Sequence, residues 1–291
     1  DSFSGLNALK EVKLPNDLTE LGNSAFYGCD QLKKVTIGAS LTSLNTYAFD
    51  DCPKLKTVRV SKSNHVLYAK DNMLINKKKK SVIWIAPAKK KVVIPNGTKV
   101  IGDYCFYGSK AESLVIPKSV KKIGKKALEA SDLEKIRLKK ENKVYAKDGS
   151  CIYKKKTKEL VVVTASKGGQ AVKISPKVKK ITRDAMTAGD NFIVNDGSSL
   201  DYIVIPASTI LCDSWYQFYK AGYITCDVVF RGKTLPKYSS GAQNIFPLFC
   251  TYYVPKGMVK KYKNWIKKTA PDYSSIIKVK TCTKKVKKST K

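Results

Sequence analysis

The chain carries few side chains that could perform acid–base or nucleophilic chemistry. Its single histidine is His65, and a Ser-His-Asp or Cys-His arrangement would have to use it. The adjacent Asn64 and Val66 supply no partner for such an arrangement, although Asp71 is close in sequence. We therefore expect His65 to be an exposed structural residue, and we expect no catalytic residues.

The cysteines show no spacing that is typical of a metal site. Zinc sites need ligands a few residues apart, whereas no CxxC pair occurs among the eight cysteines, at positions 29, 52, 105, 151, 212, 226, 250 and 282. Cys29 and Cys52 are separated by 23 residues, the period of the repeat described below. Two alternatives stay open for this pair, namely buried thiols in neighbouring repeats or a disulfide between them. We expect no metal and no cofactor.

The carboxylates also fail to suggest an active site. Asp71 and Asp148 occupy matching positions in two similar segments, where an aspartate commonly stabilises a turn. A glycosidase pair would need two carboxylates within about 5–10 Å, and nothing in the sequence pairs any two. Neither a GxxxxGK[ST] loop nor a GxGxxG motif is present. An enzyme is therefore the weaker alternative.

The net charge is strongly positive and unevenly distributed. It amounts to +33, and only four of the 56 basic residues are arginines. Residues 1–60 hold seven basic and seven acidic residues, whereas residues 255–291 hold 13 lysines and one acid, a balance of 13 − 1 = +12. Such a field attracts polyanions without specificity. Specific nucleic-acid readers use arginine forks and aromatic platforms, so we expect at most non-specific nucleic-acid binding.

Four apolar positions recur every 23 residues across the first sixty positions. These columns are Phe3-Phe26-Phe49, Leu9-Leu32-Leu55, Val12-Val35-Val58 and Leu14-Ile37-Val60. A fixed period in the twenties is typical of a solenoid, in which each unit packs only against its neighbours. The step shortens to 22 further along, as between Ile94 and Ile116. We expect strands near residues 12, 35, 58, 92, 114, 136, 172, 203, 228 and 252.

The repeating unit is clearest at residues 9–32. Its LxxVxL segment predicts a short strand, which Pro15 ends because proline cannot donate to a ladder. Gly22 then permits a turn, and Ala25-Phe26 predicts a short helical or 3-10 corner. Strand, turn and short helix in repetition are the leucine-rich-repeat plan. The expected fold is a β-rich solenoid of the α/β repeat type, forming a curved rod.

Two similar insertions interrupt the expected stack, at about 64–87 and 142–165. Each contains a YAKD phrase, a short strand, a lysine-rich turn and an apolar strand. Alternating apolar residues around such turns predict β-hairpins. The lysine runs 77–80 and 154–156 would then lie at exposed hairpin tips.

The remaining domain boundaries come from the end of the chain. We expect a single solenoid over 1–268, with a C-terminal cap at about 252–268, because a terminal repeat needs an atypical cover. Residues 269–291 are expected to form a lysine-rich tail or linker. No run of about 18 apolar residues occurs, so no membrane insertion is expected. The chain begins within a repeat and without a leader, which predicts a processed or truncated product.

The outward positions of the strands are the candidate binding residues. In the first three strands these positions are mainly basic, and stacking at about 4.8 Å would make them a basic stripe. In later strands apolar or aromatic residues replace the last of them. The candidate ligand-binding face consists of Lys33, Lys34, Arg59, Val93, Val115, Tyr202 and Tyr253. The alternative is that lysine only solubilises an exposed sheet and prevents strand pairing.

Several phrases resemble those of the BspA-like leucine-rich repeat family. IPNGTKVIGDYCF at 94–106 and IPKSVKKIGKKAL at 116–128 are similar to its IPxxVxxIGxxAFxxC unit. The hairpin from Tyr145 to Lys154 and the phrase Val254–Tyr262 are also typical of the family. The resemblance covers about residues 3–268, although 184–200 and 207–225 fit poorly. It implies a bacterial surface or secreted protein, with adhesion in some members and no shared catalytic residues.

From these observations we expect a noncatalytic interaction or adhesion module that is extracellular or on the cell surface. Its partner would be a protein, an anionic glycan or a cell-wall polymer, and a monomer is favoured. The alternative is a structural spacer that presents another domain. The sequence leaves the ligand, the mode of surface attachment and the oligomeric state open.

Overall fold

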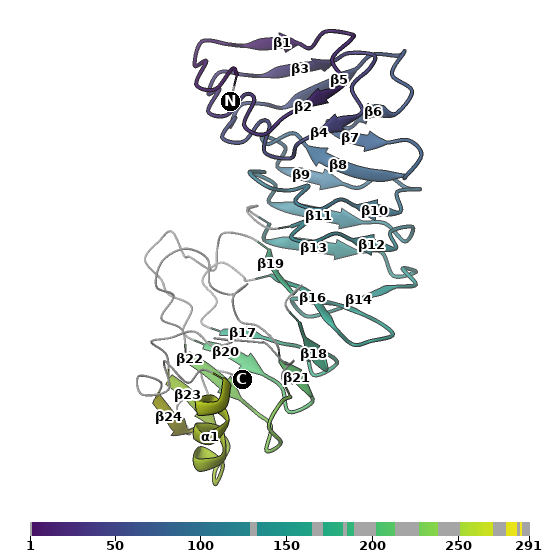
Figure 1. Cartoon of the computed structure of the whole chain (residues 1–291). Coiled ribbons are helices and arrows are strands. Elements are labelled where there is room, and N and C mark those ends of the chain that lie inside the picture. The colour runs from purple at the N-terminus through teal and green to yellow at the C-terminus, as the bar shows by residue number, and fades with distance from the viewer. Residues whose placement is uncertain are drawn as a thin grey trace. The chain divides into compact units, whose positions relative to one another are not determined.

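The computed structural model describes residues 2–128, 133–164, 171–182, 185–188, 202–212, 227–237, 251–269, 278–283 and 286. The chain divides into two compact units, Asp1–Lys143 and Val144–Lys291. The expected end of the solenoid at residue 268 stays a prediction. Each unit is a stack of short strands joined by turns (Figure 1). The boundary falls at the second insertion.

Parallel strands at the repeat interval build unit 1. They form two three-stranded sheets, β1 (Glu11–Lys13), β3 (Lys34–Ile37) and β5 (Thr57–Val60), and then β9 (Lys91–Val93), β11 (Ser113–Ile116) and β13 (Lys135–Leu138). Val12, Val35 and Val58 are Cα partners, which confirms the 23-residue column. All ten predicted strand positions lie within strands of the structure.

A second row of strands follows the turn of each coil. It comprises the pair β2 (Glu20–Leu21) and β4 (Ser43–Leu44), then the five-stranded sheet of β6 (Leu67–Lys70), β7 (Met73–Asn76), β8 (Ser81–Ile85), β10 (Val100–Ile101) and β12 (Lys122–Ile123). The first insertion supplies β6, β7 and β8 as an antiparallel meander. Its first turn places Asp71 and Asn72 at φ 50° and 58°, a conformation that these two residue types tolerate. The predicted hairpin is confirmed.

Unit 2 repeats the plan with the second insertion. β14 (Tyr145–Asp148), β15 (Cys151–Lys154) and β16 (Leu160–Thr164) form the second meander, and β19 (Met186–Ala188) joins it. The main sheet contains, in order, β17 (Ala171–Lys173), β20 (Tyr202–Ile205), β22 (Asp227–Phe230), β23 (Thr251–Val254) and β24 (Lys278–Thr281). β18 (Lys180–Ile181) and β21 (Leu211–Cys212) form a separate pair.

The C-terminal region is more structured than a linker. The helix α1 (Val259–Thr269) buries Tyr262, Trp265 and Ile266, and the Tyr262 ring lies 4.9 Å from the ring of Phe230. Lys278–Thr281 then pair in parallel with β23. β24 thus lies within the expected lysine-rich tail or linker, and its buried Val279 adds an apolar residue to the edge of the sheet.

The core of unit 1 contains a column of stacked aromatic rings. Phe3 and Phe26 lie 5.2 Å apart at 13°, and Phe26 and Phe49 lie 5.4 Å apart at 11°. Trp84 of the first insertion continues the column at 5.4 Å from Phe49. The corners that hold these rings are hydrogen-bonded turns, so the short helices expected there are absent from the described corners.

Candidate functional site

Three of the seven candidate residues lie on β3 and β5 or beside them. Lys33 and Arg59 are exposed, and Lys34 is half-buried. The Nζ of Lys34 lies 2.8 Å from Oε2 of Glu11 on β1. Because this carboxylate shares the face, the basic stripe includes a paired acidic residue.

Val93 and Val115 form a second patch of unit 1. They are Cα partners on β9 and β11, and Arg137 follows Val115 in the same row. The side chain of Val93 is 57% exposed, whereas Val115 is half-buried. This row belongs to a different sheet from β3 and β5, so the structure gives unit 1 two candidate patches.

Tyr202 and Tyr253 belong to unit 2, where the candidate face is partly covered. Their rings lie 6.3 Å apart at an angle of 64°. Both side chains are half-buried, and they pack against a small cluster that contains Val286 near the C-terminus. Partial burial, followed by the nearby carboxylate of Asp227, raises the pKa of the Tyr253 phenol.

The sequence had placed the outward residues of β20 and β22 in solvent, and this expectation is wrong. Val204 is 6% and Val229 is 0% exposed, because Val286 and Cys282 belong to the same cluster. The apolar row of unit 2 is thus covered by the chain itself. Within unit 1 the five candidate residues divide between two sheets, and Tyr202 and Tyr253 share the main sheet of unit 2.

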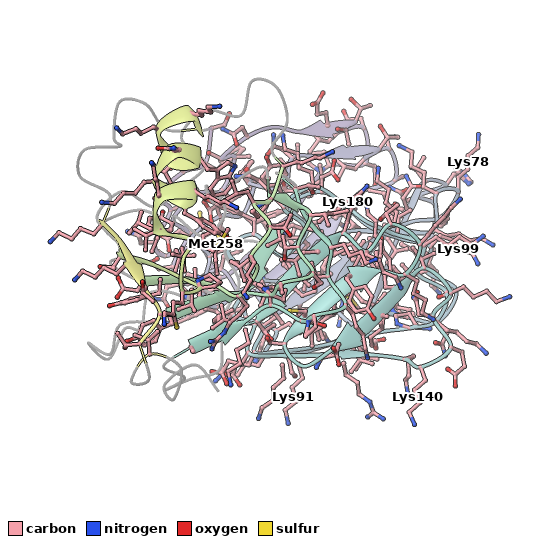
Figure 2. All side chains as sticks on the ribbon, turned by 90° about the horizontal axis from the view of Figure 1, so that it is seen from below. Lys78, Lys91, Lys99, Lys140, Lys180 and Met258 are labelled. Carbon is pink, nitrogen blue, oxygen red and sulfur yellow. The ribbon has the colours of Figure 1, made fainter. Side chains whose placement is uncertain are left out.

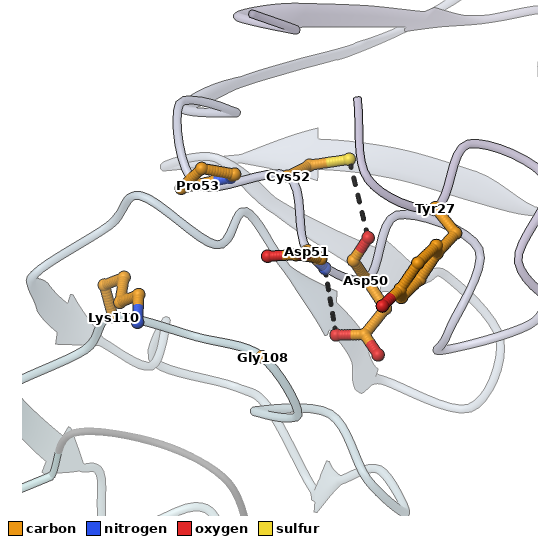
Figure 3. Close-up of a pocket in the computed structure, with 7 residues that line it drawn as sticks. All are labelled: Tyr27, Asp50, Asp51, Cys52, Pro53, Gly108 and Lys110. Carbon is orange, nitrogen blue, oxygen red and sulfur yellow. Dashed lines mark hydrogen bonds between the residues drawn. The ribbon is translucent and has the colours of Figure 1, made fainter. Parts of the chain in front are cut away.

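Unit 1 also contains a small pocket of about 270 Å³ next to a corner (Figure 3). Its lining residues are Tyr27, Asp50, Asp51, Cys52, Pro53, Gly108 and Lys110. Burial raises the pKa of the Asp50 carboxyl, although the backbone N–H of Asp51 donates to it at 3.0 Å. Sequence reasoning did not predict this pocket, since it arises from residues more than fifty positions apart.

The cysteines beside the pocket are structural. Cys29 and Cys52 are both buried and carry free thiols, which decides between the two alternatives left open by their spacing. The Sγ of Cys52 donates to the carbonyl oxygen of Phe26 at 3.1 Å, as Cys29 does to Phe3 at 3.3 Å. Burial raises the pKa of the Cys52 thiol to about 12, so the thiolate required of a nucleophile is scarce at neutral pH.

The lining of this pocket does not include His65, Asp71 or Asp148. His65 is exposed between Asn64 and β6, and Asp71 is exposed in the β6–β7 turn. Asp148 accepts a hydrogen bond from Ser175 at 2.6 Å, which lowers its pKa. Asp148 thereby links the second insertion to the following coil. Asp71 lies in a turn, as the sequence predicted.

Sequence reasoning missed two buried asparagines. Asn64 and Asn142 are 1% and 0% exposed, and the Nδ2 of Asn64 donates to the carbonyl oxygens of Gly38 and Leu41. Both asparagines begin an insertion, so aligning the two insertions would have revealed them. They hydrogen-bond the start of each meander to the preceding coil.

The residues that the structure describes contain neither a metal-binding cluster nor a membrane-spanning helix. Among those residues, no group of three or more His, Cys, Asp or Glu side chains could hold a metal ion. In the same residues, no helix combines the length and the apolar character that a membrane span requires.

Comparison with known families gave one match over more than half of the chain. The profile of the BspA type leucine rich repeat region matches residues 1–86 and 86–167, with six copies. No match was found among curated proteins.

Solved structures with similar folds come from bacterial proteins. A leucine rich cell surface protein from Faecalibacterium prausnitzii has 20% identity over 77% of this chain, with a TM-score of 0.45, and the chain covers 60% of that protein. The pneumococcal vaccine antigen PcpA has 19% identity, with a TM-score of 0.46. The match covers 94% of this chain and 68% of that protein. A leucine-rich repeat protein from Eubacterium ventriosum has 22% identity, with a TM-score of 0.42. The match covers 86% of this chain and 67% of that protein.

Proposed function

This chain belongs to the family of BspA-type leucine-rich repeat proteins, and from that premise we propose that it is a noncatalytic interaction module at the bacterial cell surface or in the surrounding medium. One observation carries the proposal. The parallel register of β1, β3 and β5 holds the outward side chains of three successive coils in straight rows. Such rows offer an extended face for a partner.

The binding face that we assign is the outer surface of unit 1. Lys33 and Arg59 provide exposed charge, and Val93 provides an exposed apolar side chain on a rigid strand. Strands position contact residues more firmly than loops do. A combination of apolar and charged contacts suits a protein partner, and the lysines also suit an anionic glycan or wall polymer.

Binding is favoured over catalysis by the character of the pocket. Its cysteine thiol is held protonated by burial. Its two carboxylates are adjacent in the chain, and Asp51 N–H donates to the Asp50 carboxylate. An enzyme would instead need an activated nucleophile or a positioned acid–base pair facing a common reacting atom.

The test is a binding panel of extracellular proteins and anionic glycans, measured at low and at near-physiological salt. For any partner that still binds at physiological salt, Lys33→Ala/Arg59→Ala and Val93→Asp should each weaken binding about tenfold or more. The matched control, Lys260→Ala/Lys263→Ala on α1, removes the same charge from exposed positions of unit 2. Equal loss in the control and the test variants would contradict the assigned face.

A spacer function is the second candidate, and the covered row of unit 2 favours it. Since Val204 and Val229 are buried under the chain's own C-terminal residues, this row is closed to a partner. A chain that only separates two attached domains would bind nothing in the panel. It would also tolerate Lys33→Ala/Arg59→Ala without any loss of function in its parent protein.

A further inference from the structure

The first corners of unit 1 are joined by backbone hydrogen bonds from one coil to the next. The N–H of Gly5 donates to the carbonyl oxygen of Tyr27 at 2.8 Å, and that of Gly28 donates to the carbonyl oxygen of Asp50 at 3.1 Å. Asp51 follows Gly28 by 23 residues in the same column, but its N–H donates to the side-chain oxygen Oδ1 of Asp50 at 3.0 Å. Asp51 thus satisfies within its own corner the donor that Gly5 and Gly28 direct to the next coil.

The series of corners is interrupted after Asp51 because the first insertion takes the place of a corner. The insertion forms the meander of β6, β7 and β8 instead. Hydrogen bonds between corners resume at Tyr104, whose N–H donates to the carbonyl oxygen of Lys125 at 3.1 Å. The pocket of about 270 Å³ lies at this break, with Asp50 from the corner before it and Gly108 from the corner after it.

Two close contacts join the corners on either side of the break. The rings of Tyr47 and Tyr107 lie 4.6 Å apart at an angle of 74°. A Cβ atom added to Gly108 would lie 2.9 Å from Oδ1 of Asp50. Glycine permits this approach, and it also permits the φ of 68° at this position. Packing between the two corners therefore fixes the walls of the pocket.

The lining of the pocket combines an aromatic ring with hydrogen-bonding groups of both kinds. Tyr27 is 45% exposed, and Figure 3 shows Asp50 beside its ring. The carboxylates of Asp50 and Asp51 accept hydrogen bonds, whereas the ammonium group of Lys110 donates them. A sugar ring matches this set, because its hydroxyl groups donate and accept hydrogen bonds and its C–H groups pack against an aromatic face.

A cation is the competing occupant, since the lining contains two carboxylates. Lys110 lines the same pocket and would repel it. Residues 1–143 hold 28 basic and 14 acidic residues, a balance of 28 − 14 = +14. Figure 2 shows lysines of this unit, among them Lys78 and Lys99, extending away from the ribbon. The field of the unit therefore disfavours the approach of a cation and has no such effect on a neutral ligand.

We propose that this pocket, called the corner pocket below, binds one neutral sugar residue of a glycan. Its volume of about 270 Å³ lies just below the range of about 300–1,000 Å³ that is usual for drug-sized ligands, which suits a single sugar ring. The ring packs against Tyr27, and its hydroxyl groups donate to Asp50 and Asp51. This inference goes beyond the proposed function, because the corner pocket and the assigned binding face share no residue.

The experiment measures the binding of the methyl glycosides of glucose, galactose, mannose and N-acetylglucosamine to the full chain by saturation-transfer NMR. Tyr27→Ala removes the aromatic wall. Asp51→Gly removes a carboxylate and introduces the residue type of Gly5 and Gly28 at a φ of 53°, which glycine adopts readily. At least one glycoside should bind the parent, equally well at low and at physiological salt, because it is uncharged. Each variant should bind that glycoside about tenfold more weakly.

Tyr68→Ala and Asp71→Gly are the matched controls. Tyr68 is another exposed tyrosine of unit 1, at 36%, and Asp71 is another exposed aspartate with a positive φ, at 50°. Neither residue lines the corner pocket, so both controls should bind as the parent does. If Tyr27→Ala unfolds, Asp51→Gly must show the selective loss by itself.

Three other outcomes would overturn this inference and leave the proposed function standing. The first is that no glycoside binds the parent, or that the controls lose as much binding as the two lining variants. The second is tighter, salt-sensitive binding of butylammonium, measured beside the glycosides, which would assign the corner pocket to a cation. The third is a loss of glycoside binding in Lys33→Ala/Arg59→Ala but not in Tyr27→Ala, which would move the sugar to the assigned binding face.

Discussion

Asn142 takes the same place at the start of the second insertion that Asn64 takes at the start of the first. The Nδ2 of Asn64 donates to the carbonyl oxygens of Gly38 and Leu41 at 3.0 and 2.9 Å. The Nδ2 of Asn142 donates to two carbonyl oxygens of its preceding coil at 3.2 and 2.9 Å. Each side-chain amide thus joins the start of its insertion to the preceding coil.

Asn64→Ala should destabilise the protein by about 1–3 kcal/mol, because it leaves two buried carbonyl oxygens without their donor. The loss is measured by urea unfolding. Asn7→Ala changes an exposed asparagine of the same unit and should have little effect. If the two variants unfold at the same urea concentration, the bridging amide has no energetic role.

Phe26→Ala should cost about 3–5 kcal/mol, because the removed ring is the middle member of a buried stack and leaves a cavity. Phe26 is 2% exposed, whereas Phe3, at the open end of the same stack, is 51% exposed. Phe3→Ala is therefore the control and should cost much less. Thermal unfolding of the two variants checks the order, and a Phe26→Ala protein with parental stability would refute the repeat register.

Gly38→Ala should destabilise unit 1, because its new methyl group would overlap the carbonyl oxygen of Pro15 and displace backbone. Overpacking of this kind costs about 1–3 kcal/mol. Gly22→Ala is the control, since no atom lies within 4 Å of a methyl group built there. If Gly22→Ala is neutral or slightly stabilising while Gly38→Ala is destabilising, the loss of stability comes from the close contact between neighbouring coils. It then does not come from the loss of a glycine as such.

The Cys52 thiol should resist alkylation in the folded protein at pH 8, because burial raises its pKa from 9.0 to about 12. Cys282, which is half-exposed, should react first, and peptide mapping by mass spectrometry distinguishes the two. Between pH 9 and 12 the unfolded state loses this proton while the folded state keeps it. The contribution of Cys52 to stability is therefore complete below pH 9 and declines as the pH rises. Rapid labelling of Cys52 without unfolding would contradict this account.

Val286→Asp should uncover the apolar row of unit 2, because Val286 is 4% exposed and packs with Val204 and Val229. The expected result is increased binding of a hydrophobic dye such as ANS, with unit 1 unchanged. Thr281→Asp, at an exposed position of β24, introduces the same charge as a control. Equal dye binding by both variants would show that Val286 is not the cover.

The positions of the strands were predictable because a solenoid pairs each coil only with its neighbours. The Cα partners Val12, Val35 and Val58 are one period apart in the sequence. The repeat period therefore predicts directly which residues pair in the folded protein. The two hairpins were predictable for a related reason, since their pairing is local and their turn residues favour positive φ. The lysine run 77–80 was visible in the sequence, but the alignment of Lys80 with Lys99 and Lys121 depended on the register.

The sequence by itself thus determined the repeat, the strand positions, the two insertions and the family, all of which depend on short or periodic separations. Only the tertiary structure decided which outward residues are free. Val286 lies 57 positions beyond Val229, since 286 − 229 = 57, and it belongs to no repeat column, so no period encodes their contact. The pocket beside Asp50 likewise combines residues from segments whose separation follows no pattern.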